Sequence, residues 1–404
     1  MRKYFTHLCL SLLASMISTT AWALEPNSDG IYEIANKDDL VAFSALVNGG
    51  QANINAVLTA DIDMSDVNGY VPIGNDANRY CGTFDGQGHR IMSLKIKGEQ
   101  FLGVFGIVTG GAVIKNFILD ENSAIEGTED AGLVGSTRGS GKVTLQCLGN
   151  EADITIKGTN AGGILGDNDD TQATIYMERC FYTGDIESAG NSATMCGWIG
   201  LGGTIYDSYS IASVEGYESE EKAFTRRKGS TDLANCYSNF GTQVTPTNKE
   251  EALSGRLAWM LNGETFVSPK FFQTLGEEPH PVPFASSQVV YKYGDTFASF
   301  TPADASSFAE ARENIVFAET QAYSDILAYK PFVENYLATV NSWTSMTNYE
   351  EFCSSYSDAQ TLKSQLSASI TAYGKYVERC KYILGYLQDN IFSNDARTTL
   401  ESYL

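Results

Sequence analysis

Carboxylates are the side chains of this sequence best suited to chemistry, and their densest cluster is Asp167-Asn168-Asp169-Asp170. Closely spaced carboxylate oxygens are the ligands that Ca²⁺ prefers, and paired carboxylates act as acid and base in glycosidases. Asp and Asn are equally ordinary in turns, and no second acidic group can be placed opposite this cluster from the sequence. If the chain binds a metal, we expect Asp167, Asp169 and Asp170 to hold Ca²⁺.

The segment from Asp85 to His89 places a histidine near a carboxylate, and such a pair can act as acid and base. The same segment, rich in glycine, is typical of a turn between two strands, and we favour that interpretation. Asp61 and Asp63, with Asp66 nearby, alternate along a short strand and could present oxygens to a cation. They lack the glycine and glutamate of a full calcium loop, which favours a solvated strand edge.

Histidine is rare in this chain, which limits the reactions open to it. The three histidines are His7, His89 and His280, and none belongs to an H-E-x-x-H zinc motif. The sequence also lacks a P-loop, a nucleophile elbow and paired CxxC motifs. An enzyme with this sequence would work chiefly through carboxylates, lysine, arginine or tyrosine.

Two sequence marks recur through the middle of the chain with a period near thirty residues. The first is a tetrad in which two glycines enclose two apolar residues: Gly103-Val-Phe-Gly106, Gly132-Leu-Val-Gly135, Gly163-Ile-Leu-Gly166 and Gly197-Trp-Ile-Gly200. The second is a polar residue, then a small or apolar one, then usually an aromatic: Asn116-Phe117, Gln146-Cys147-Leu148, Arg179-Cys180-Phe181, Asp207-Ser208-Tyr209 and Asn235-Cys236-Tyr237. Two marks in phase indicate a repeat architecture, in which each unit buries its apolar face against its neighbours.

The segments between the marks are short and alternate polar and apolar residues, as in Val143–Cys147 and Ile154–Ile156. Between residues 80 and 245 no apolar residues recur at helical spacing for three turns. We therefore predict a parallel β-solenoid with roughly three short strands per coil and coils about 4.8 Å apart. The tetrad glycines are expected at sharp corners, where a positive φ angle suits glycine best.

Cysteines recur within the second mark. In a solenoid we expect Cys147, Cys180 and Cys236 to stack as buried thiols, in one row with Phe117 and Ser208. Among the other cysteines, only Cys353 and Cys380 are candidates for a disulfide. An enlarged core makes a disulfide framework unnecessary for a chain of this length.

The tetrads resemble the GLUG repeat of bacterial surface and secreted proteins, and Gly132-Leu-Val-Gly135 matches its pattern letter for letter. The resemblance covers about residues 28–295 and includes Gly82–His89 before the tetrads and Phe272–Gly276 after them. It implies a right-handed parallel β-helix and a role at the cell surface or in the medium. The last coil departs from the pattern, because Lys222-Ala-Phe-Thr225 stands where a tetrad is expected.

The predicted fold is therefore mainly β, with capping helices on the solenoid and a small C-terminal helical bundle. A helix is expected at residues 38–47 and another at 249–261, each covering an open end of the solenoid, and a strand at 288–293. The predicted domains are a signal peptide at 1–23, an N-terminal cap and first coil at 24–80, a GLUG-type β-helix at 81–245, a C-terminal capping segment at 246–300 and a helical bundle at 301–404.

The charge of the chain narrows its partners. Its net charge is −22, which argues against nucleic acid and anionic membrane surfaces as ligands. The basic start, short apolar core and A-x-A site of residues 1–23 predict Sec-dependent export, with the protein secreted or held at the surface of a bacterium.

The sequence favours a non-catalytic role in adhesion or recognition of a glycan or surface protein. Tyr182, Tyr209 and Tyr237 lie near the expected coil corners and are the candidates for stacking on sugar rings. A polysaccharide lyase or hydrolase on the same fold is the alternative, and it requires acidic or basic groups aligned across neighbouring coils. A structural spacer that self-associates is the third possibility.

Overall fold

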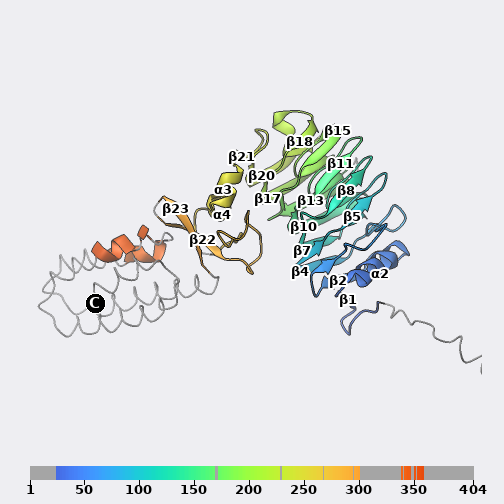
Figure 1. Ribbon diagram of the computed structural model, residues 1–404, viewed down its shortest axis with the longest axis horizontal. Helices are drawn as coiled ribbons and strands as arrows, with labels where there is room; N and C mark the ends of the chain where they lie inside the picture. The colour runs from blue at the N-terminus through green and yellow to red at the C-terminus, as the bar shows by residue number, and fades with distance from the viewer. Residues whose placement is uncertain are drawn as a thin grey trace, which may run out of the picture.

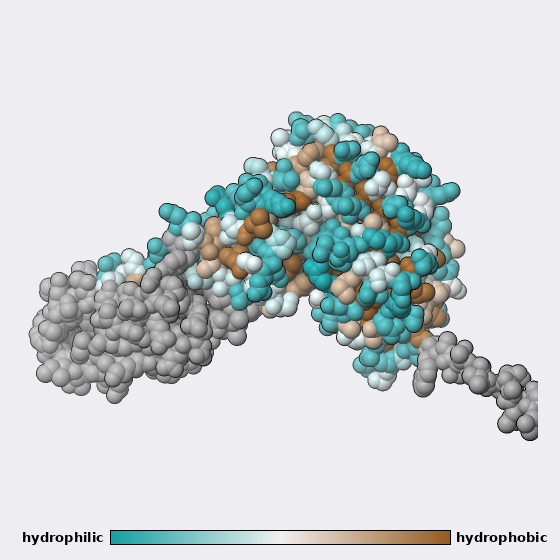
Figure 2. Space-filling view, viewed as in Figure 1, coloured by the Kyte–Doolittle hydropathy of each residue, from teal (hydrophilic) through white to brown (hydrophobic). Residues whose placement is uncertain are grey.

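The computed structural model describes residues 24–300 except 169–171, 228–229, 267 and 294, together with 338–339, 341–346, 350–351 and 353–358. The predicted signal peptide and nearly all of the predicted helical bundle lie outside these residues, as does Cys380. No helix among the described residues is long and apolar enough to span a membrane. On the face shown in Figure 2, hydrophilic residues predominate over the solenoid.

Residues 31–246 form a parallel β-solenoid of about six turns, which confirms the predicted fold class (Figure 1). The largest sheet follows the order β1 (Ile31–Ile34), β2 (Asn55–Leu58), β4 (Thr83–Met92), β7 (Val113–Leu119), β10 (Ser140–Asn150), β13 (Gln172–Glu178), β17 (Gly202–Ser210), β20 (Ser230–Ser238) and β21 (Thr245–Pro246), joined by β3 (Ile62–Asp63) and β14 (Phe181–Tyr182). We number the coils one to six by the strands β4, β7, β10, β13, β17 and β20 of this sheet. The short strand β14 continues β13 in coil four.

Two five-stranded sheets complete coils one to five. One contains β5 (Lys95–Lys97), β8 (Ala124–Gly127), β11 (Asp153–Ile156), β15 (Ile186–Ser192) and β18 (Val214–Tyr217). The other, which carries the tetrads, contains β6 (Phe105–Val108), β9 (Val134–Thr137), β12 (Leu165–Asn168), β16 (Cys196–Ile199) and β19 (Thr225–Arg227). All neighbouring strands within these three sheets run parallel, so equivalent side chains stack from coil to coil.

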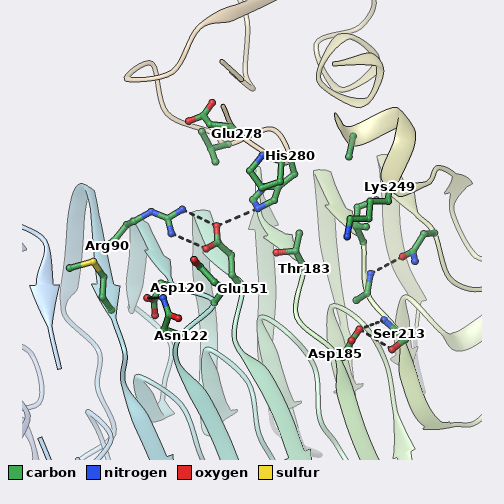
Figure 3. Close-up of a pocket in the computed structure, with 18 residues that line it drawn as sticks. Arg90, Asp120, Asn122, Glu151, Thr183, Asp185, Ser213, Lys249, Glu278 and His280 are labelled. Atoms are coloured by element: carbon green, nitrogen blue, oxygen red, sulfur yellow. Dashed lines mark hydrogen bonds and ion pairs between the residues drawn. The ribbon is translucent and has the colours of Figure 1, made fainter. Parts of the chain in front are cut away.

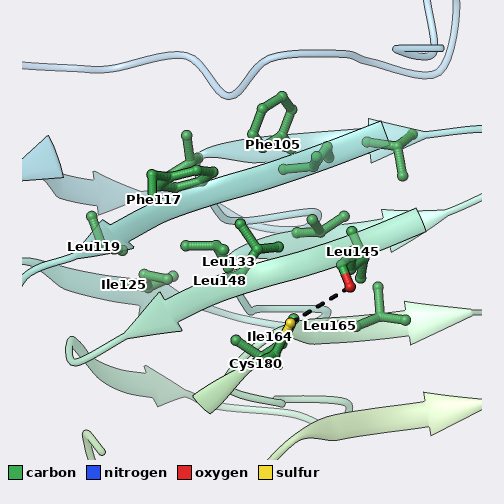
Figure 4. Close-up of a cluster of buried hydrophobic side chains, with 14 of the residues drawn as sticks. Phe105, Phe117, Leu119, Ile125, Leu133, Leu145, Leu148, Ile164, Leu165 and Cys180 are labelled. Atoms are coloured by element: carbon green, nitrogen blue, oxygen red, sulfur yellow. Dashed lines mark hydrogen bonds between the residues drawn. The ribbon is translucent and has the colours of Figure 1, made fainter. Parts of the chain in front are cut away.

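The apolar side chains of the three sheets meet in one continuous interior. Phe84, Phe105 and Phe117 pack ring against ring at its N-terminal end, with centroids 5.2 to 6.4 Å apart. Figure 4 shows how Leu133 and Cys180 continue this core in later coils. The burial of these side chains is the main stabilising contribution to the solenoid.

The tetrad glycines are required for close approach between coils and not for a positive φ angle, which corrects our expectation. None of them has a positive φ. A Cβ at Gly166 would lie 2.5 Å from the carbonyl oxygen of Gly135, and one at Gly163 would lie 2.1 Å from the ring of Tyr182. The chain therefore needs glycine because neighbouring backbones and one interior ring occupy the place of the side chain.

The fourth structural repeat does not coincide with the tetrad Gly197–Gly200 that the sequence indicated. Leu165 pairs with Cys196 and Asp167 with Trp198, so Gly197 occupies the place of Gly166. The structural fourth unit is thus residues 194–197. In the next coil Thr225 pairs with Cys196, which places Arg226 where the closing glycine would stand.

Arg226 completes coil five in place of a glycine. Its side chain is buried, and its Nη1 donates to the Asn160 side chain and to the carbonyl oxygens of Asn191 and Gly197 at 2.8 to 3.0 Å. Its guanidinium also lies over the ring of Trp198. The departure from the repeat is therefore a specific closure of the coil and not a loss of structure.

Residues in the left-handed region form a column where the largest sheet bends. This bend column comprises Gln87, Asn116, Cys147, Arg179, Asp207 and Asn235, with φ between 47° and 62°. Cys147 therefore does not join the interior thiol row, which corrects our prediction. The row that stacks behind the column consists of Phe117, Leu148, Cys180, Ser208 and Cys236.

Helices cover the solenoid near both ends. At the N-terminal end α2 (Lys37–Asn48) begins at Asn36, whose side chain accepts hydrogen bonds from the backbone of Asp38 and Asp39, and it buries Leu40, Phe43 and Val47. The single C-terminal helix that we expected is divided into α3 (Lys249–Leu253) and α4 (Arg256–Leu261) at Gly255, where φ is +86°.

The remaining described elements are short. The expected strand near residue 290 is β22 (Val289–Tyr293), which forms an antiparallel hairpin with β23 (Thr296–Phe300). Two single 3-10 turns are η1 (Glu220–Lys222) and η3 (Trp343–Ser345).

Candidate functional site

Asp167 occupies a buried position at the end of β12, and its carboxylate forms an ion pair with Arg138 at 3.2 Å. The Ser136 hydroxyl lies 3.4 Å away. Asp169 and Asp170 lie outside the described residues, so the Ca²⁺ prediction for these two stays a prediction. Within the described part of the chain, no group of three histidine, cysteine, aspartate or glutamate side chains is placed to hold a metal ion.

Asp85 and His89 do not form the acid–base pair that their spacing allows. Burial alone would raise the pKa of Asp85, but hydrogen bonds from Asn116 and the Gln87 backbone, with the nearby Lys115, lower it overall. His89 instead lies 3.1 Å from Asp61. A carboxylate held in this way has no proton to donate near neutral pH.

The acidic residues that precede coil one, Asp61, Asp63 and Asp66, also have separate partners. Asp61 accepts from the backbone of Arg90 as well as contacting His89. Asp63 accepts from the Ser65 backbone, and Asp66 pairs with a lysine of α2. Each carboxylate therefore caps or pairs locally, as expected for a solvated strand edge.

The structure removes two of the three tyrosines from any direct role in stacking on sugars. Tyr182 points into the solenoid interior and Tyr209 is covered from outside, and neither exposes its ring. Tyr237 is half-buried, and its hydroxyl donates to Asn235. The prediction that Tyr182 and Tyr209 bind a ligand is therefore wrong for this conformation, because both rings are packed into hydrophobic clusters.

Two aromatic rings on the outside of the largest sheet, those of Phe181 and Tyr209, are covered by the chain's own C-terminal segment. Phe181 and Tyr209 stack with parallel rings at 5.4 Å, and Phe271 packs against Tyr209 at 5.8 Å. The Tyr209 hydroxyl donates to the carbonyl oxygen of Pro281 at 2.6 Å. We call residues 270–284 the strap, because this segment lies across the outside of several coils.

A cleft of about 800 Å³ opens between the solenoid and the strap with helix α3 (Figure 3). Eighteen residues line it: Arg90, Met92, Asp120, Glu121, Asn122, Glu151, Thr183, Asp185, Ile211, Ala212, Ser213, Asn239, Lys249, Ala252, Glu278, Pro279, His280 and Val282. The solenoid contributes the floor and the C-terminal segment the opposite wall. A second cleft, of about 550 Å³, lies beside His89 and Phe284.

One residue from each of the six coils contributes to the floor of the larger cleft. This floor column consists of Met92, Asp120, Glu151, Thr183, Ile211 and Asn239. From the second member onward, each donates its backbone N–H to the preceding coil, at 2.8 to 3.2 Å. Because parallel strands lie about 4.8 Å apart, the six positions span about 24 Å along the solenoid axis.

Glu151 connects the floor of the cleft to its opposite wall. Arg90 donates to both of its carboxylate oxygens, at 2.8 and 2.9 Å, and His280 of the strap lies 3.4 Å from Oε1. Burial alone would raise the pKa of Glu151, but the hydrogen bond to His280 and the charges of His280 and Arg90 outweigh it and lower the pKa. Glu151 is therefore an ionised structural anchor near neutral pH.

Other polar groups of the cleft remain available to a ligand. Among the residues that the structure describes, the Thr183 hydroxyl, the Asn239 amide nitrogen and the Lys249 ammonium group hydrogen-bond to no other protein group. Asp185 is exposed and uses Oδ1 to accept from Ser213. Donors and an acceptor thus face the same open space.

The sequence contains a signal for the floor column that our predictions did not use. Five of its members stand three residues after the members of the interior row Phe117, Leu148, Cys180, Ser208 and Cys236, as Asp120 does after Phe117 and Glu151 after Leu148. The period thus identifies residues that must share one face. It does not show that this face lies beside the strap, because that depends on how residues 246–284 fold back.

Comparison with known proteins yields one partial sequence match and one solved structure with a limited similarity. No family model matches the chain. Halomucin from Haloquadratum walsbyi is 34% identical over 150 residues, which is 33% of this chain and 2% of halomucin. A solved structure, described as that of a putative immunoglobulin A1 protease from Bacteroides ovatus, has a TM-score of 0.45 and 16% identity, and covers 64% of this chain and 93% of that one. Neither similarity assigns an activity to this chain.

Proposed function

We propose that this chain is an exported recognition protein that binds a glycan in the larger cleft and leaves it chemically unchanged. The cleft across six coils is the observation that carries the proposal. Its lining combines polar groups such as Thr183 and Asn239 with apolar ones such as Met92 and Ile211. Ligand sites commonly pair a few directed polar groups with an apolar surface, and sugars offer hydroxyls and C–H faces to both.

A binding role fits the cleft better than catalysis. A general acid at neutral pH requires a carboxyl group whose pKa is raised. Glu151 is a buried carboxylate of the cleft floor, and its partners lower its pKa. Its bonds to Arg90 and His280 also leave it without the freedom to move a proton to a substrate.

The location outside the cell rests on two features. Residues 1–23 have the pattern of a secretory signal peptide, and part of the chain is similar to a segment of halomucin. We also propose membership in the GLUG-repeat group, on the tetrads and on the solenoid that they form. Adhesion to a glycan at or near a bacterial surface follows as the role.

A glycan array probed with purified protein tests the proposal. The variant Thr183→Trp fills the cleft, and Val71→Trp places the same side chain at an exposed position of the N-terminal cap, away from it. We expect one or more glycans to bind to the wild type and to Val71→Trp but not to Thr183→Trp. Absence of any glycan signal, or equal binding by both variants, would contradict it.

Turnover is measured on the same glycans. Mass spectrometry of each bound glycan after prolonged incubation should find no new fragments. New oligosaccharides that disappear in Asp185→Ala would replace the recognition role with that of a polysaccharide lyase or hydrolase.

A further inference from the structure

The floor of the larger cleft receives one residue from each coil, so it repeats along the solenoid axis. The column from Met92 to Asn239 follows the solenoid axis, one residue per coil. A cleft formed in this way is long in one dimension and periodic along it. A ligand that fills the full length is therefore extended, and one that contacts each coil in turn has groups at a spacing close to that of the coils.

We propose that the cleft binds a linear, uncharged polysaccharide that lies parallel to the solenoid axis, with about one sugar unit per coil. This inference rests on the proposed function and specifies the ligand and its orientation. An extended pyranose unit is close in length to one strand spacing, so a span of about 24 Å accommodates about five units.

The composition of the lining favours an uncharged chain. Acidic side chains outnumber basic ones along the cleft, and the whole chain carries a net charge of −22, so a polyanion is repelled. Glu151 is neutralised by Arg90, and both carboxylate oxygens of Glu278 accept hydrogen bonds from protein groups, those of Ser287 and Thr274. The unpaired ammonium of Lys249 opposes a polycation at one end.

The available hydrogen-bonding groups are suited to hydroxyls. Thr183 can both donate and accept, Asn239 offers an N–H donor and Asp185 an acceptor. Ile211, half-buried between Thr183 and Asn239 in the column, can contact the C–H face of a ring. From coil four to coil six the column is polar, apolar and polar in turn, which suits a chain that offers both hydroxyls and apolar faces.

An extended peptide is the competing occupant, and the geometry of the floor disfavours it. A peptide that adds to a sheet lies parallel to the strands and takes its main-chain hydrogen bonds from an open edge. The cleft crosses the strands, and the backbone N–H groups of its floor column are already bonded between coils. A peptide here would leave its own main-chain groups without these partners.

Calorimetric titration with oligosaccharides of increasing length tests the proposal. The probes are uncharged cello-oligosaccharides, cationic chitosan oligosaccharides and anionic oligogalacturonates, each from the disaccharide to the octasaccharide. We expect only the uncharged series to bind, with affinity that rises with each unit up to about five units and then levels off. The affinity should change little with salt, because no net charge is neutralised on binding.

Two conservative variants test the orientation. Thr183→Val removes one hydroxyl near the middle of the column, and Asn239→Asp removes the amide donor at its end while keeping the Oδ1 that accepts from the Ala212 backbone. Loss of one hydrogen bond of about 1 kcal/mol is a fivefold loss of affinity. We expect this loss at all lengths for Thr183→Val and only with the longer oligomers for Asn239→Asp.

Three results would overturn the inference. They are affinity independent of length, preference for either charged series, and equal effects of the two variants at every length. Each leaves the proposed function standing if Thr183→Trp still abolishes glycan binding. If no probe binds and the glycan array is also silent, the proposed function fails with it.

Discussion

A single methyl group added at Gly166 should test the stacking of the tetrads. In Gly166→Ala the new Cβ would lie 2.5 Å from the Gly135 carbonyl oxygen and 2.7 Å from the Ala131 nitrogen, whereas ordinary contacts begin near 3.4 Å. The neighbouring coil would have to move by about 0.9 Å, and all the contacted atoms belong to backbone. Overpacking of a well-packed core usually costs about 1–3 kcal/mol, and we expect about 3 kcal/mol or more here.

Gly203→Ala is the matched control. Its Cβ would lie 3.1 Å from the Ile175 carbonyl oxygen, so a shift of about 0.3 Å suffices, and its backbone does not require a positive φ. Its effect should be within about 1 kcal/mol of zero, since alanine also reduces the entropy of the unfolded chain. Urea unfolding followed by tryptophan fluorescence measures both variants. Equal midpoints, with unchanged slopes, would refute the explanation that close approach makes glycine necessary at Gly166.

Four further substitutions have expected outcomes that denaturation experiments can check. Cys147→Asn should stabilise the protein by up to about 1 kcal/mol, since asparagine tolerates a φ of +52° better than cysteine, whereas Cys180→Asn should destabilise it by about 2 kcal/mol or more by placing an amide in the interior. Glu151→Gln should cost about 2 kcal/mol at neutral pH, a value reduced because the arginine partner is one-third exposed. Because the pKa of Glu151 is lowered on folding, its contribution is present above the unfolded value near 4.5 and is lost as the pH falls through the folded pKa, so the difference from wild type should narrow in acid. Tyr209→Phe should cost about 1 kcal/mol because it keeps the ring stack and loses the bond to Pro281.

The solenoid could be predicted because its repetition is written in the sequence. Every coil needs the same small and apolar residues at the same places, so two marks in phase were sufficient for the fold. The reason for the glycines could not be inferred in the same way. Positive φ and close approach both select glycine, and only the coordinates of the adjacent coil distinguish them, as they do at Gly163 beside Tyr182.

The register of the later coils was harder to predict because the repeat changes there. Gly197 follows Gly166 by one structural period, yet in the sequence Gly197-Trp-Ile-Gly200 resembles a complete tetrad. The tetrad pattern therefore predicted residues 197–200 as the repeating unit, whereas the structural unit is residues 194–197. The pairing of Leu165 with Cys196 resolves the choice, and it depends on interior packing that a single sequence does not display.

The candidate site was predicted least well, because it depends on contacts between distant segments. His280 is separated from Glu151 by more than a hundred residues, and no local pattern connects them. Likewise, Tyr209 was correctly placed beside a coil corner, but the strap that covers it could not be inferred. The alignment of the floor column could have been inferred from the period, although we did not predict it, whereas its use as the floor of a cleft could not.

The strap also changes how the solenoid can come apart. In a simple solenoid each coil contacts only its neighbours, so the terminal coils can unfold one at a time. Here His280 reaches Glu151 in coil three, while Phe271 packs on Tyr209 in coil five. Because both contacts belong to the strap, we expect its release to loosen coils three to five together, so that they unfold as one cooperative unit and not in independent steps.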